Sequence, residues 1–160
     1  MTGLVMLIVG VAVGIVFAGL FAKSMMRSKM VVPEKSAHSF DETCARLEKT
    51  VGDADGWSFP MDSFDMSAKL SEKNALPGNL KRITQYFVCS PPIAKQVLGD
   101  SPHLSAIMPC TWAVYEKTDG SVWVSKMNIP MMSKVMGGVV GESMAVVAKA
   151  EAGFAEQVLR

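Results

Sequence analysis

The first 22 residues carry no charged side chain, and residues 4–22 are almost entirely apolar. At about 1.5 Å per residue, roughly 20 such residues in a helix cross a hydrocarbon core of about 30 Å. The segment Met1-Thr2-Gly3 lacks the positive charge of a signal peptide, and Ala22-Lys23-Ser24 is a poor cleavage site. The sequence therefore favours a retained transmembrane anchor over residues 1–22, with a cleaved signal peptide as the alternative.

Basic residues follow this apolar segment at once and none precedes it. They are Lys23, Arg27, Lys29 and Lys35. Cytoplasmic flanks of membrane spans are enriched in lysine and arginine, so this asymmetry places the following domain in the cytoplasm. We therefore predict a single-pass protein of the cell (inner) membrane, in which residues 23–35 form a basic juxtamembrane linker.

Small residues recur every fourth position along the predicted anchor, at Gly10, Gly14, Ala18 and Ala22. Helices in a bilayer associate where small residues let their backbones approach closely. The pattern predicts contact with integral membrane subunits of other proteins, although glycine and alanine are common in any membrane helix.

Residues 36–160 are long enough for one domain with one core. They carry 12 basic and 14 acidic residues, a net charge of −2. This balance argues against nucleic-acid binding, which needs a basic surface. Three cysteines, an odd number, argue against a disulfide framework and fit a reducing compartment.

The spacing of apolar residues predicts the secondary structure of this domain. Ser39 and Glu42 form a capping box that predicts a helix over residues 40–52. Further helices are predicted from Pro91, from Pro130 up to Gly137-Gly138, and over residues 141–159. Strands are predicted over residues 57–61, 82–89, 104–116 and 121–128. This order indicates an α+β domain over residues 36–160, with an antiparallel sheet packed on helices.

Three segments, in this order, carry a family resemblance. They are Ser39-Phe40-Asp41-Glu42-Thr43, Val88-Cys89-Ser90-Pro91-Pro92 and Met108-Pro109-Cys110. Together they resemble the family called domain of unknown function 302, with Ser90 in place of the family's asparagine. The resemblance implies a TATA-binding-protein-like fold (β-α-β4-α), a prokaryotic source and a family whose members often form homodimers through the soluble domain. It implies no reaction.

Cys89 and Cys110 are the first candidates for chemistry. Cys89 directly precedes a predicted helix, where the helix dipole favours a thiolate, and Cys110 begins a strand that can approach it. The pair suits thiol redox chemistry or soft-metal binding, and His103 offers a third ligand. The alternative is that these cysteines pack as small apolar side chains and that His103 is a solvated loop residue.

Methionines gather at Met131, Met132 and Met136. Thioethers are ligands for Cu(I), but a flexible core or an adaptable protein interface explains the same pattern. No motif requires a cofactor, and no catalytic constellation is present in the sequence, which favours a role without catalysis. We therefore expect a non-catalytic accessory subunit of a larger membrane complex, with an electron-transfer complex as one candidate. A membrane-tethered thiol or soft-metal protein and a small-molecule sensor are the alternatives.

Overall fold

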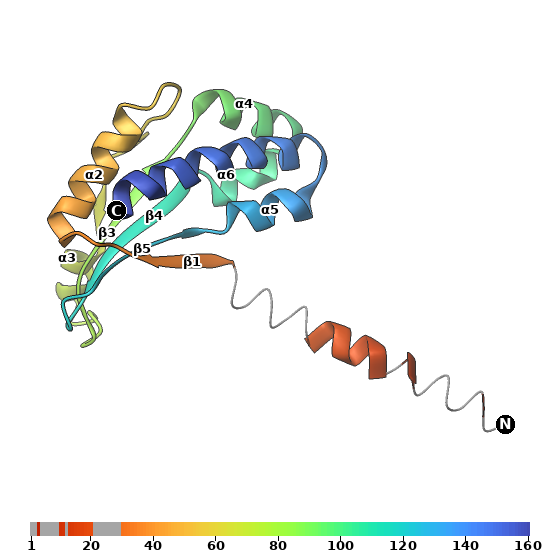
Figure 1. The fold of residues 1–160 in the computed structure, drawn as a ribbon, viewed down its shortest axis with the longest axis horizontal. Helices are drawn as coiled ribbons and strands as arrows, with labels where there is room; N and C mark the ends of the chain where they lie inside the picture. The colour runs from red at the N-terminus through yellow and green to blue at the C-terminus, as the bar shows by residue number, and fades with distance from the viewer. Residues whose placement is uncertain (1–2, 4–9, 12, 21–29) are drawn as a thin grey trace. The chain divides into compact units, whose positions relative to one another are not determined.

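The structure, a computed structural model, describes Gly3, residues 10–11, residues 13–20 and residues 30–160 (Figure 1). It has two compact units, Met1–Met30 and Val31–Arg160. Among the described residues, no helix is both long enough and apolar enough to cross a membrane. Much of the predicted anchor, with Ala22 and the basic residues Lys23, Arg27 and Lys29, lies outside the described residues. Gly10, Gly14 and Ala18 are described as helical and exposed.

The second unit is built on one antiparallel sheet. Its strands pair in the order β1-β5-β4-β3-β2. Their bounds are β1 Val31–Lys35, β2 Phe64–Asp65, β3 Leu80–Val88, β4 Cys110–Lys117 and β5 Val122–Met127. The predicted α+β class with an antiparallel sheet packed on helices is confirmed.

The helices of this unit are one long C-terminal helix and several shorter ones. The long helix, α6, contacts α2, α4 and α5, and Figure 1 shows it in dark blue among them. The bounds are α2 Phe40–Gly52, α3 Met66–Ser71, α4 Pro91–Asp100, the 3₁₀ helix η1 Pro102–Ile107, α5 Ile129–Met136 and α6 Gly138–Leu159.

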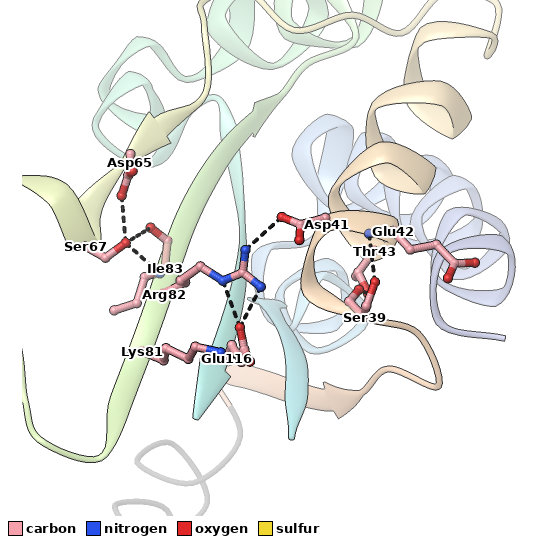
Figure 2. Close-up of polar contacts among 10 residues, drawn as sticks. All are labelled: Ser39, Asp41, Glu42, Thr43, Asp65, Ser67, Lys81, Arg82, Ile83 and Glu116. Carbon is pink, nitrogen blue, oxygen red and sulfur yellow. Dashed lines mark hydrogen bonds and ion pairs between the residues drawn. The ribbon is translucent and has the colours of Figure 1, made fainter. Parts of the chain in front are cut away.

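The start of α2 is fastened to the sheet by charged side chains. Ser39 caps the helix, since its Oγ accepts a hydrogen bond from the Glu42 N–H at 3.3 Å. Figure 2 shows Arg82 of β3 between two carboxylates. Its Nη1 lies 2.8 Å from Asp41 Oδ1 on α2, and its Nε donates to Glu116 Oε2 on β4 at 2.8 Å. These bonds explain why Glu116 can be buried in the sheet, because its negative charge is paired.

The core lies between the helices and one face of the sheet. Burial alternates along β4 and β5, as expected for a sheet packed on one side. One group of buried side chains joins the sheet to α2 and α6, and it includes Trp112, Leu47 and Val158. A second group lies around α4, α5 and the first half of α6, and it includes Val97, Ile129 and Met144.

Three sequence expectations differ from the structure. The predicted linker over residues 23–35 overlaps β1, which pairs with β5 and joins the sheet. Residues 57–61 contribute only an isolated bridge, Ser58 with Cys89, in place of a strand. The strand predicted from residue 104 begins at Cys110, because η1 occupies residues 102–107. Each difference arises where pairing with a distant strand, or its absence, decides the local structure.

Candidate functional site

Cys89 and Cys110 lie near each other at one end of the sheet. Val88 pairs with Cys110 in the register of β3 and β4, and Cys89 follows directly. Burial raises the pKa of both thiols, to about 12 for Cys110, where Glu151 and Cys89 add to the effect. For Cys89 this direction is opposite to the one expected from its position before α4. All three cysteines are free, and Cys44 packs against the core.

His103 does not join the two cysteines. It lies on η1 with an exposed side chain. In the part of the chain that the structure describes, no three His, Cys, Asp or Glu side chains are placed to hold a metal ion. The predicted metal site of Cys89, Cys110 and His103 is thus not formed there, because His103 points to solvent from a separate segment.

The methionines of α5 divide between the interior and the surface. Met132 packs against the second core group, whereas Met136 is exposed and Met131 is half-buried. Met132 and Met136 also line a small cavity of about 10 Å³ together with Cys110. We call it the sulfur pocket, and its sulfur-bearing residues are Met108, Cys110, Met127, Met132, Met136 and Met144.

Glu151 is a residue that the sequence reasoning missed. It lies on α6, where its carboxyl group faces the sheet and its side chain is buried, with only 2% of the residue exposed. Its Oε1 accepts a hydrogen bond from Nε1 of Trp112 on β4 at 3.1 Å. Its Oε2 is buried and has no hydrogen-bond partner among the described residues. The signal was present in the sequence, because Glu151 interrupts the apolar stripe of Val147, Phe154 and Val158.

A pocket of about 370 Å³ opens at Glu151, between α6 and the β1–β5 edge of the sheet. We call it the Glu151 pocket. Part of its lining is apolar and includes Val32 and Ala152. Its charged lining residues are Glu34, Lys126, Glu151, Glu156 and Arg160.

Most of these charges already have a partner. Lys126 Nζ lies 2.5 Å from Glu34 Oε1 and 4.9 Å from the centre of the Trp112 ring. Arg160 Nη1 lies 3.4 Å from Glu156 Oε1. Because the two cations are paired with two carboxylates, ionised Glu151 leaves the pocket with one uncompensated negative charge.

The electrostatics of Glu151 follow from its burial. Burial raises the pKa of its carboxyl from the ordinary value of 4.5 to about 7, although the Trp112 hydrogen bond and the Lys126 charge act against this. The carboxyl therefore changes its charge near neutral pH. It can accept a hydrogen bond and hold a cation when ionised, and it can donate a proton when neutral.

Comparison with known proteins gives a family and a fold, but no activity. An uncharacterized protein of Aquifex aeolicus (strain VF5) is 38% identical over 53 residues, and this match spans 33% of the present chain and 37% of that protein. The crystal structure of an uncharacterized conserved protein DUF302 from Bacillus stearothermophilus is similar to this fold with a TM-score of 0.69. That likeness covers 82% of this chain and 98% of the other, at 22% identity.

The family resemblance carried by the three sequence segments is confirmed over most of the chain. Residues 32–156 match the family described as "Domain of unknown function DUF302". The matched range includes both cysteines of the predicted pair, Trp112 and Glu151. It begins inside β1 and ends inside α6, and it leaves out the N-terminal unit. The chain therefore belongs to the family of the domain of unknown function DUF302.

Proposed function

We propose that this domain binds a small organic amine in the Glu151 pocket and acts as a ligand-binding protein. The observation that carries the proposal is the buried Glu151 Oε2 without a partner among the described residues. A buried polar atom of this kind costs free energy unless a donor reaches it. A ligand with an N–H group would supply that donor.

The charge and shape of the pocket support an ammonium group attached to an apolar body. Ionised Glu151 leaves one negative charge beyond the Lys126–Glu34 and Arg160–Glu156 pairs, and one ligand cation would balance it. The apolar wall would then bury the rest of the ligand. A volume of about 370 Å³ lies within the usual range of small-molecule sites, about 300–1,000 Å³.

Calorimetric titration of the full chain with n-hexylamine tests this function, with hexan-1-ol as the uncharged probe. We expect hexylamine to bind at pH 8 and hexanol to bind more weakly. At pH 6 the free Glu151 is mostly protonated, so amine binding should release a proton to the buffer. Glu151→Gln should lower the affinity about tenfold or more, as expected for a lost charged hydrogen bond.

Glu142→Gln is the matched control, because Glu142 is exposed on the same helix and does not line the pocket. It should leave the affinity unchanged. Equal binding by hexylamine and hexanol, or an unchanged affinity in Glu151→Gln, would show that the carboxyl holds no ligand cation.

A second candidate function, favoured by a different observation, is an accessory subunit of a membrane complex. Large apolar side chains are exposed around the junction of α5 and α6, and Val135 is 78% exposed. The others are Met136, Val139 and Val146. Such side chains suit contact with another protein. In this proposal residues 1–22 form the membrane anchor, the domain faces the cytoplasm, and the stripe of Gly10, Gly14, Ala18 and Ala22 packs on a partner helix.

A further inference from the structure

The sulfur pocket brings together methionines from across the sequence. Met108 precedes β4, Met127 ends β5, Met132 and Met136 belong to α5, and Met144 belongs to α6. The only other sulfur on its lining is that of Cys110. The remaining lining residues are Val97, Leu104, Ile107 and Ile129, so no described lining side chain carries oxygen or nitrogen.

The size and lining of the cavity restrict what it can hold. About 10 Å³ is room for roughly one atom-sized guest. A water molecule needs two to four polar partners, and this lining offers it too few. Ions such as Mg²⁺ and Ca²⁺ need oxygen ligands, and Zn²⁺ takes cysteine, histidine and carboxylate ligands. Thioether and thiolate sulfur, in contrast, selects soft ions such as Cu(I).

We propose that the sulfur pocket binds one soft monovalent metal ion of the class of Cu⁺, through methionine thioethers and the Cys110 sulfur. The ion arrives as Cu⁺, so binding involves no electron transfer. A Cu–S bond forms at Cys110, the S–H bond breaks, and the proton passes to solvent. The site then holds one positive ion and one thiolate, and is neutral.

Two further features favour a cation at this place. The Glu151 carboxyl interacts electrostatically with Cys110, and Met127 lines both the sulfur pocket and the Glu151 pocket. When Glu151 is ionised, its negative charge therefore favours a cation in the sulfur pocket. Met136 is 38% exposed, so its thioether can meet an ion at the surface and pass it inward.

Titration of the reduced full chain without oxygen tests the proposal, with Cu⁺ held by a competing chelator and with Ag⁺ as a redox-inert substitute. We expect one ion per chain in the sulfur pocket. Met132→Leu and Cys110→Ala should each weaken the affinity for the metal ion about tenfold or more. Removing a residue that only hydrogen-bonds to a metal ligand already has an effect of about that size. Leucine nearly conserves the volume of methionine, so the fold should persist.

Two control variants separate this pocket from other sulfur atoms in the chain, and a third separates it from the Glu151 pocket. Met61→Leu changes an exposed methionine, Cys44→Ala changes a cysteine on α2, and Glu151→Gln removes the proposed amine site. The first two should bind the ion as the wild type does. Glu151→Gln should retain one ion per chain while losing the amine, so failure of either proposal can be recognised alone.

X-ray absorption of the Cu⁺ form gives a second measurement that needs no variant, and it should show sulfur ligands only. The proposal is wrong if nitrogen or oxygen ligands appear or if the chelator keeps all the metal. It is also wrong if Met132→Leu binds the ion as tightly as the wild type.

Discussion

The Glu151 carboxyl is buried beside an indole, and its effect on stability depends on whether it carries a proton. When neutral, it accepts the Trp112 hydrogen bond at little cost. When ionised, it keeps a charge in a poorly solvated place, which the Trp112 hydrogen bond and the nearby Lys126 charge offset only in part. The same side chain can thus bind a ligand cation and weaken the ligand-free fold, a combination typical of functional sites.

The pH dependence of stability should reveal this group. The pKa of Glu151 is raised in the folded state, so its contribution to stability is complete below about pH 4.5 and is lost as the pH rises through about 7. The displacement of the pKa corresponds to about 3 kcal/mol. Glu151→Gln should therefore unfold with a higher free energy than the wild type at pH 8, by up to that amount, and with a similar one at pH 5.

Denaturant unfolding at several pH values between 5 and 8 measures this difference. Glu142→Gln on the exposed side of α6 should follow the wild type at every pH. A difference between Glu151→Gln and the wild type that stays constant with pH would mean that Glu151 does not titrate in this range.

At the scale of elements, local signals predicted the helices well and the sheet edges poorly. Ser39 capping predicted the start of α2, and Gly137-Gly138 separated the two C-terminal helices, because caps and glycines act over a few residues. The sequence analysis did not predict strand β1, because its partner β5 lies some 90 residues further along the chain. The sequence singled out Cys110 beside Cys89 and His103, and only the fold places it among methionines of four other segments.

The crossing of α5 and α6 depends on a glycine. A Cβ added at Gly141 would lie 2.8 Å from the backbone oxygen of Ser133, too close for van der Waals contact. Gly141→Ala should therefore push the helices apart and lower the free energy of unfolding by about 1–3 kcal/mol, as overpacking does. Thermal unfolding measures the loss.

Gly153 on the same helix provides the comparison, because a Cβ there would meet nothing within 4 Å. Gly153→Ala should raise stability by up to about 1 kcal/mol through the better helix propensity of alanine. If both variants change stability in the same direction, the close approach at Gly141 does not control the packing of α5 on α6.

At the scale of the whole molecule, the described core groups lie entirely within the second compact unit, Val31–Arg160. The apolar character of residues 4–22 is known from the amino-acid sequence.

Gly14→Ile tests the association proposed for the accessory function. The change keeps the segment apolar, but it places a branched side chain in the small-residue stripe, so partner helices should no longer approach closely. Purification of the tagged full chain from native membranes, with mass spectrometry of bound proteins, should show partners that the variant loses. Val11→Ile, outside the stripe, should keep them. The same partners on Gly14→Ile would mean that the stripe makes no contact.

The edge strand β1 is a wall of the Glu151 pocket and also the first element after the N-terminal unit. It is held by one ladder to β5 and by the pairing of Glu34 with Lys126. Tension applied at residue 30 would load that ladder first. Peeling β1 away would remove Val32 and Glu34 from the pocket and leave Lys126 free to turn toward Glu151. A mechanical pull on the N-terminal unit would thus change the net charge of the Glu151 pocket.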